Sequence, residues 1–206
     1  FAATEYGIYF SINSGNSWSK LNGGVPTISF RDLAIHKREN DLVGASFGRG
    51  FFVFDDISVF RELSNSQMND KATLFSVKNA WWYIPRPYLG FNDPWNGLKG
   101  SQGDSYFVAP NPPFGAVFTY HLSEGLVTKK EVRTKKEKST LKKGKPVGFP
   151  GWKIVESERR ELDSKVLIEV KDSNGEVVRR LEGPTSKGFH RIAWDLRYPS
   201  PNSILG

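Results

Sequence analysis

The chain contains no cysteine among its 206 residues, and it has a single methionine. Without cysteine, disulfide bonds and thiolate metal sites are excluded, and the redox compartment stays open. No apolar run approaches the roughly eighteen residues that a membrane-crossing helix needs, so we expect no membrane span. Histidine is also scarce, and the three that occur do not follow the close spacings of metal-binding motifs.

Turn-forming and strand-forming residues are abundant instead. The chain holds 20 glycines and 12 prolines, and 14% of its residues are aromatic, a composition that favours short strands joined by turns. Its length suffices for one large domain or two small ones. Because the chain begins at Phe1 rather than at a methionine, we expect it to be part of a longer protein.

The positive charge is concentrated in one short segment. Residues 129–145 hold nine basic and two acidic residues, so they account for the whole net charge of +7. A nucleic-acid-binding domain spreads its basic groups over a folded face, so no nucleic-acid partner is expected. We predict a solvated arm with an exposed helix over residues 129–141, ended by Gly144 and Pro146. Contact with an acidic polymer or a membrane surface is the alternative.

Two segments near the start share small residues, then a glycine turn, then an aromatic strand. They are residues 2–10 and 44–53, and Gly7 and Gly50 lie 43 positions apart. A period of about 40–50 residues with several short strands per unit is typical of a β-propeller blade. The predicted strands are residues 7–11, 31–35 and 41–45, with a polar turn over 37–40.

Residues 11–18 (Ser-Ile-Asn-Ser-Gly-Asn-Ser-Trp) are similar to the Asp-box of BNR-repeat propellers, Ser-x-Asp-x-Gly-x-x-Trp. Asn13 stands where Asp is usual, and Asn can make the same turn-capping hydrogen bond. Residues 31–56 resemble the last blade of the sortilin-like, glycosyl-hydrolase-like group. The resemblance implies a structural hairpin away from any active site. It also implies one to one and a half blades, too few to close a ring around a ligand channel.

Aromatic residues are dense in the middle of the chain, where proline and glycine break the periodicity. We expect strands at residues 74–77 and 80–84. The aromatic side chains either fill the gap between two domains or form an exposed platform that stacks on a sugar or peptide. The candidate carbohydrate-binding residues are Trp81, Trp82, Tyr83 and Trp95.

Strand patterns return near the C-terminus. Residues 172–175 (Asp-Ser-Asn-Gly) predict a hairpin whose Asn-Gly pair accepts positive φ at both central positions. Short antiparallel strands with polar turns predict a small β-sandwich. Residues 111–116, 175–179 and 188–197 resemble the FlgD-like immunoglobulin-like module, from which the charged insertion 123–164 departs. That resemblance implies a secreted, periplasmic or cell-surface protein. The predicted strands are residues 115–122, 166–171, 176–181 and 189–196. Trp152 is expected to anchor the chain as it returns from the insertion.

No residue pattern predicts catalysis. The chain has no nucleophile elbow and no phosphate-binding loop. Asp55 and Asp56 are adjacent, so in a strand they point to opposite faces and do not flank one glycosidic bond; we interpret them as turn formers. His121 and His190 fall in two predicted strands that can pair, and a hydrogen-bonded structural role is commoner for such residues than a shared metal. We expect no catalytic residue, metal or cofactor.

The sequence therefore predicts an all-β fold with three parts: truncated terminal BNR-type blades over residues 1–63, a connecting segment over 64–113, and an immunoglobulin-like β-sandwich over 114–206. The favoured function is a non-catalytic structural or binding module of a larger secreted BNR-propeller protein. Its partners would be the rest of that propeller and a carbohydrate or protein ligand. The alternative is an accessory part of a glycoside hydrolase that contributes carbohydrate contacts. Sortilin-like peptide binding and polyanion binding through residues 129–145 are further hypotheses.

Overall fold

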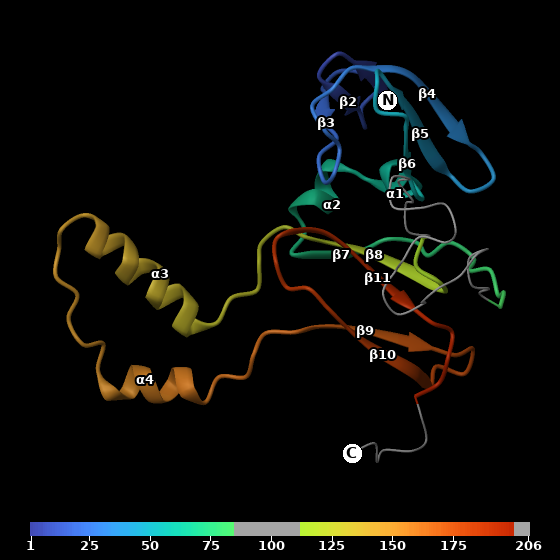
Figure 1. Ribbon diagram of the computed structural model, residues 1–206. Coiled ribbons are helices and arrows are strands. Elements are labelled where there is room, and N and C mark those ends of the chain that lie inside the picture. Colours follow the sequence, from blue (N-terminus) through green and yellow to red (C-terminus); the bar gives the residue numbers. More distant parts are fainter. Residues whose placement is uncertain (85–111, 200–206) are drawn as a thin grey trace, which may run out of the picture.

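The computed structural model describes residues 1–84 and 112–199, and it shows an all-β fold with few helices. Within these residues, small antiparallel sheets build a body of two halves, and a pair of helices projects from the body as an arm (Figure 1). In the first half, β1 (Ala2–Thr4), β2 (Gly7–Phe10) and β3 (Ser19–Lys20) form one sheet, and β4 (Phe30–His36), β5 (Asp41–Ser46) and β6 (Phe51–Phe54) form another.

These two sheets pack on each other through one apolar cluster. Ile8 of β2, Phe30 of β4 and Leu42 of β5 are its buried centre. Because side chains alternate along a strand, Leu42 and Gly44 of β5 face this core together. A Cβ atom at Gly44 would lie 3.0 Å from the Phe30 ring and 3.1 Å from Ile8, so glycine permits the close approach of the sheets. The predicted strands of this region are confirmed to within one or two residues.

The turn between β2 and β3 is held by a side-chain network. The Ser11 hydroxyl accepts hydrogen bonds from the backbone N–H groups of Asn13 and Gly15. Oδ1 of Asn13 accepts the N–H of Ser17 at 2.9 Å. Positive φ at Ser14 and Gly15 completes the reversal. Asn13 therefore makes the capping hydrogen bond that the sequence predicts for it.

Two short helices join the halves of the body. They are α1 (Val59–Glu62) and α2 (Asn65–Asn69), and neither was predicted. A capping box starts α2: Ser64 Oγ accepts the Gln67 N–H, and the Gln67 side chain accepts the Ser64 N–H. Val59 and Leu63 bury their side chains against Phe75, which follows the first strand of the second half.

The second half consists of two sheets. In one, β11 (Gly188–Trp194), β8 (Ala116–Leu122) and β7 (Ala72–Leu74) lie in that order, and the other is the hairpin of β9 (Val166–Lys171) and β10 (Val177–Gly183). Tyr120 and Leu122 of β8 are buried against Ile168 of β9. Thr119 and His121 alternate with them and are buried as well, so both faces of β8 are covered.

Two local predictions fail in this half. Residues 80–84 form no strand, and only β7, over Ala72–Leu74, extends near the predicted strand 74–77. In the β9–β10 turn, positive φ occurs at Gly175 but not at Asn174. The Asp172 carboxylate accepts the N–H groups of Asn174 and Glu176, which favours a longer turn with one left-handed residue over the two-residue turn expected.

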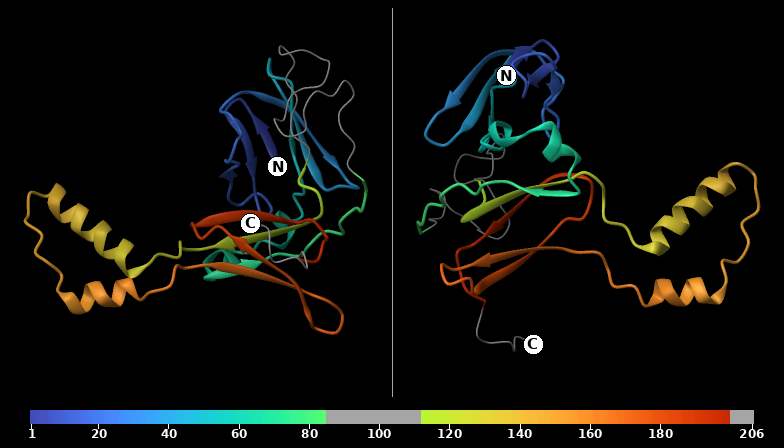
Figure 2. Two further views of the ribbon diagram at one scale, coloured as in Figure 1. Left: turned by 60° about the horizontal axis from the view of Figure 1, so that its bottom comes forward. Right: turned by 180° about the vertical axis from the view of Figure 1, so that it is seen from behind.

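The charged insertion forms the arm, with α3 (Lys129–Lys142) and α4 (Trp152–Arg159) side by side and away from the body (Figures 1 and 2). Thr128 and Glu131 make a capping box at the start of α3, and the predicted helix is confirmed with one further residue. No residue of either helix is buried. Trp152 begins α4 and is exposed, so the prediction that it anchors the chain is wrong. No helix in the described ranges has the length and apolar character to cross a membrane.

Candidate functional site

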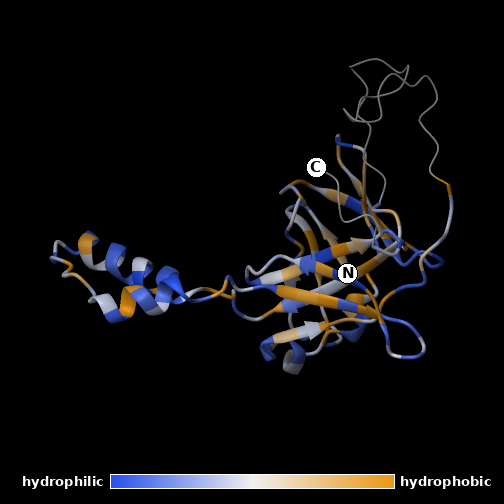
Figure 3. Ribbon diagram, turned by 90° about the horizontal axis from the view of Figure 1, so that it is seen from below, coloured by the Kyte–Doolittle hydropathy of each residue, from blue (hydrophilic) through white to orange (hydrophobic). Residues whose placement is uncertain are grey.

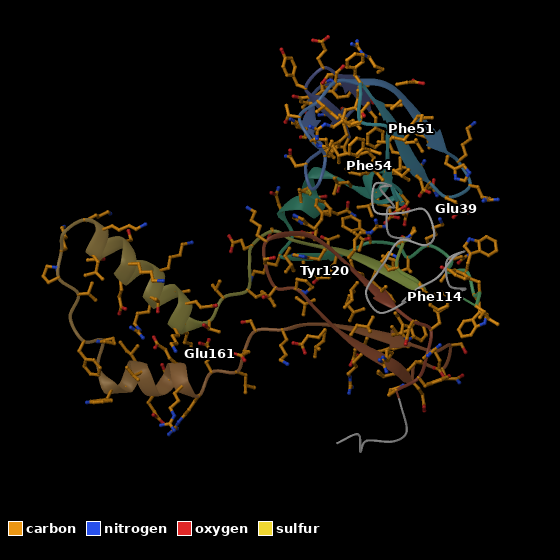
Figure 4. All side chains as sticks on the ribbon, in the orientation of Figure 1. Glu39, Phe51, Phe54, Phe114, Tyr120 and Glu161 are labelled. Carbon is orange, nitrogen blue, oxygen red and sulfur yellow. The ribbon has the colours of Figure 1, made fainter. Side chains whose placement is uncertain are left out.

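A cleft lies between the two halves of the body. It encloses about 450 Å³ where the β4–β5 turn and the residues after β6 face residues 78–83 and the start of β8. Figure 4 shows Glu39 on the first half and Phe114 on the second. Carboxylates line the first side, and aromatic groups together with Lys78 and Arg191 line the second. Its lining includes Glu39, Asp41, Asp55, Asp56, Lys78, Trp81, Tyr83, Phe114 and Arg191.

The aromatic side of the cleft contains two of the predicted carbohydrate-binding residues. Trp81 and Tyr83 line the cavity, and Trp82 is beside them in the chain. Their exposed fractions are 68% for Trp81, 66% for Trp82 and 49% for Tyr83, so these three do not fill a gap between domains. The Tyr83 and Trp82 rings meet the Phe114 ring edge-on at 5.0 and 6.0 Å. Trp95, the fourth candidate, lies outside the described residues.

The position of Phe114 depends on the glycine that follows it. Gly115 has a φ of +103°, and a Cβ atom there would lie 1.8 Å from the backbone oxygen of Trp194. Only glycine allows this approach between the start of β8 and the end of β11. The register of these strands pairs Ala116 with Trp194, so the aromatic side of the cleft is fixed to the sheet beneath it.

Lys78 reaches across the cleft from the aromatic side and binds the β4–β5 turn. Its ammonium group donates to the carboxylate of Glu39 and, at 2.9 Å, to the backbone oxygen of the same residue. The hydrogen bond from Lys78 lowers the pKa of Glu39, so this carboxylate is ionised at neutral pH. Both side chains are partly exposed and their heads remain within reach of a ligand.

Asp41 and Asp56 have structural roles. The Asp41 carboxylate accepts the N–H of Asp56 at 2.9 Å, and Asp56 accepts the N–H and the hydroxyl of Ser58 at 3.2 and 2.6 Å. The φ of Asp56 is +49°, a left-handed conformation that Asp tolerates better than most residues. The interpretation of Asp56 as a turn former is therefore confirmed.

Asp55 differs from its neighbour. Its backbone oxygen accepts a hydrogen bond from Arg191 Nη1 of β11 at 2.8 Å, whereas its carboxylate has no hydrogen-bond partner in the described part of the chain. Partial desolvation in the cleft, and then the charge of Asp41, raise the pKa of the Asp55 carboxyl, although the residue stays open to solvent. The two aspartates line one cleft because β6 ends at Phe54, and strand alternation no longer applies beyond that residue.

Three of the four carboxylates in the described lining of the cleft already have partners. Glycoside hydrolysis needs two carboxylates facing one bond, and here Asp41, Asp56 and Glu39 are occupied by backbone, hydroxyl and ammonium groups. Among the described residues, no three His, Asp or Glu side chains gather closely enough to hold a metal ion. The cleft offers aromatic faces, the Asp55 carboxylate, which makes no hydrogen bond to the described residues, and the ion pair of Lys78 with Glu39.

The two strand histidines do not form a site. His121 pairs with Phe189 and His190 pairs with Tyr120 in the β8–β11 register, so their side chains are on opposite faces of the sheet. The hypothesis of a shared ligand site is therefore wrong. His121 is buried, and its Nδ1 atom has no hydrogen-bond partner among the described residues. His190 Nε2 lies 2.6 Å from the backbone oxygen of Ser186.

Several cleft residues were missed by sequence reasoning. Phe114 stands in a Pro-Pro-Phe-Gly run, and its position next to a glycine was the one local signal for it. Arg191 and Lys78 have no such signal, because they reach the cleft only through tertiary packing. No family model, curated protein or solved structure matches the chain.

Proposed function

We propose that this chain is a non-catalytic binding module, the C-terminal part of a larger BNR-type propeller protein, and that its cleft holds a carbohydrate. One observation carries the proposal: Trp81 and Tyr83 stay exposed on one side of a cleft whose other side presents Glu39 and Asp55, and Lys78 reaches across from the aromatic side to Glu39. Aromatic faces opposite a few hydrogen-bonding groups are the combination that a pyranose ring needs, with its apolar C–H face and its rim of hydroxyls.

The architecture supports the propeller part of the proposal. The sheets β1–β2–β3 and β4–β5–β6 are successive meanders that pack face to face through Ile8, Phe30 and Leu42, as neighbouring blades do. The Ser11–Asn13 network has the turn-forming character expected of an Asp-box. For the C-terminal part, the packing of the β7–β8–β11 sheet on the β9–β10 hairpin supports an immunoglobulin-like module. A secreted, periplasmic or cell-surface location belongs to the same proposal.

The charge of the cleft supports a neutral or cationic sugar over an acidic one. Four carboxylates line the cavity, against Lys78 and Arg191 as the only cations among its described lining residues. A uronic or sialic acid would add a further negative charge beside the carboxylates of Asp55, Asp41 and Asp56. The volume of about 450 Å³ falls within the range usual for small-ligand sites.

A glycan array tests this function, followed by titration of the glycans that bind. We expect neutral or amino sugars to be retained. Each stacked ring contributes about 1 kcal/mol, so Trp81→Ala and Tyr83→Ala should each weaken binding roughly five- to tenfold. Trp18→Ala is the matched control, because Trp18 is an exposed aromatic residue that does not belong to the cleft lining. Retention of no glycan, or an equal loss in the control, would refute the proposal.

The alternative, an accessory role in a glycoside hydrolase, is favoured by the open aromatic side of the cleft, where Trp81 and Tyr83 lie opposite the Asp55 carboxylate. In that role the cleft would hold part of a substrate that is cleaved at a site elsewhere in the parent protein. One measurement distinguishes the two functions. Asp55→Asn would lower the hydrolysis of an extended substrate by the parent protein in the accessory role, and it would change glycan binding alone in the binding role.

A further inference from the structure

The far end of the arm combines lysines with exposed apolar side chains. Residues 138–155, which we call the tip segment, contain five lysines and no Asp or Glu. They include the end of α3, the loop that follows it and the start of α4, and they lie far from the body in all views (Figures 1 and 2). Figure 3 shows the arm as mainly hydrophilic with separate hydrophobic bands.

Two aromatic rings form the apolar part of the tip segment. Phe149 and Trp152 contact each other with ring centroids 5.1 Å apart, and they remain 64% and 79% exposed. Leu141 and Ile154 are exposed nearby in the sequence. An isolated exposed apolar residue needs no explanation, whereas two large exposed rings in contact with each other form a small apolar patch.

The lysines of the arm are available for an external partner. The acids of α3 are already occupied, since Glu131 caps the helix and Glu137 binds Arg133. In the described part of the chain, no lysine of the arm forms a salt bridge. The tip segment therefore presents an unbalanced positive charge next to its aromatic pair.

We propose that the tip segment docks on a lipid bilayer that carries anionic headgroups. Phe149 and Trp152 enter the interfacial layer, where aromatic rings are favoured, and the lysines extend to the headgroups around them. Neither a basic cluster nor a few inserted apolar groups alone gives stable attachment to a membrane, but the two together do. The arm binds the surface without crossing it, since its helices are short and polar.

The apolar residues favour a bilayer over a soluble polyanion. A nucleic acid or a sulfated polysaccharide is bound by the lysines and gains little from Leu141 and Ile154, because aliphatic side chains offer neither charge nor a stacking face. In a bilayer, aliphatic and aromatic groups all leave water together. The aromatic pair separates a bilayer from a sulfated polysaccharide such as heparin, which has no bases to stack on the rings.

The test is co-sedimentation of the full chain with vesicles of phosphatidylcholine that contain about one third phosphatidylglycerol. We expect binding to these vesicles, weaker binding at high salt, and little binding to pure phosphatidylcholine. Replacing Lys142, Lys143 and Lys145 together by Gln should lower the partition coefficient roughly a hundredfold, at about fivefold per lysine. Phe149→Ser with Trp152→Ser should lower it about tenfold and leave heparin binding unchanged.

Matched variants on the body complete the design. Lys165, Lys171 and Lys187 replaced by Gln remove the same charge outside the arm, and Trp18→Ser removes an exposed ring from the first half. Both should bind vesicles almost as the parent chain does. The proposal is overturned if the parent chain does not sediment with anionic vesicles, if the aromatic variant binds them unchanged, or if the body variants lose as much as the arm variants. Circular dichroism of each variant verifies that the helices persist.

Discussion

Arg133 of α3 and Glu158 of α4 form a two-point ion pair that joins the helices of the arm. Arg133 Nε donates to one carboxylate oxygen at 2.6 Å and Nη2 donates to the other at 2.8 Å. The third nitrogen, Nη1, donates to Glu137 at 2.6 Å. The hydrogen bonds from Arg133 lower the pKa of Glu158. Because no residue of either helix is buried, this polar contact takes the place of an apolar core.

Loss of this contact should loosen the arm and leave the body intact. We expect Arg133→Ala to reduce helical circular dichroism and to speed proteolysis between α3 and α4, because isolated helices of this length are marginal in water. Arg160→Ala is the control, since Arg160 binds Glu156 within α4 alone and both are exposed. Thermal unfolding of the body should be the same in both variants. Equal proteolysis of the two variants would contradict the role assigned to Arg133.

The sequence predicted the local elements that carry their own signals. Strand alternation and the turn residues at 37–40 located the β4–β5 hairpin, and the charged run before Gly144 and Pro146 located α3. By contrast, α4 begins after Gly151 at a φ of +94° and without a side-chain cap, so the usual start signal is missing. The turn at Gly175 was located correctly, but its type depends on the Asp172 side chain.

His121 should make stability depend on pH. Burial, and then the charges of Lys187 and His190, lower the pKa of His121 below its ordinary value of 6.5. The unfolded chain therefore binds more protons than the folded chain. The stabilisation of the fold by neutral His121 is present above that ordinary pKa and is lost as the pH falls through the lowered pKa of the folded chain. Between about pH 7.5 and 5 the loss is bounded by about 2 kcal/mol.

Urea unfolding of the parent chain and of His121→Gln across this range measures the effect. The variant should lose most of the slope between about pH 7 and 5, whereas His36→Gln, at an exposed strand end, should keep it. Three carboxylates also have lowered pKa values, Glu39, Glu158 and Glu169. Their contribution to stability is lost only at lower pH, as the pH falls below their ordinary pKa of 4.5. A slope that survives His121→Gln would show that another group is responsible.

Only the aromatic residues of the cleft were predicted from the sequence. Trp81, Trp82 and Tyr83 were candidates because aromatic residues cluster there, and two of them line the cavity. The polar side was not predicted, because its contacts join distant parts of the chain: Lys78 meets Glu39 across 39 positions, and Arg191 meets Asp55 across 136. Such contacts follow from the packing of the two halves of the body and leave no local pattern.

Asp55 and Asp56 should respond oppositely to replacement by Ala, although they are adjacent. The raised pKa of Asp55 means that its ionised form is disfavoured in the folded protein, so its contribution is most favourable below about pH 3.8 and is lost as the pH rises. Asp55→Ala should therefore leave the free energy of unfolding unchanged or slightly higher at pH 7, and this gain should vanish near pH 3.

Asp56→Ala removes the acceptor of both Ser58 hydrogen bonds and puts Ala at a φ of +49°, which should cost about 1–3 kcal/mol at pH 7. Urea unfolding of both variants at the two pH values measures these differences, and comparable destabilisation of the two at pH 7 would mean that the Asp55 carboxylate has a partner that holds it ionised.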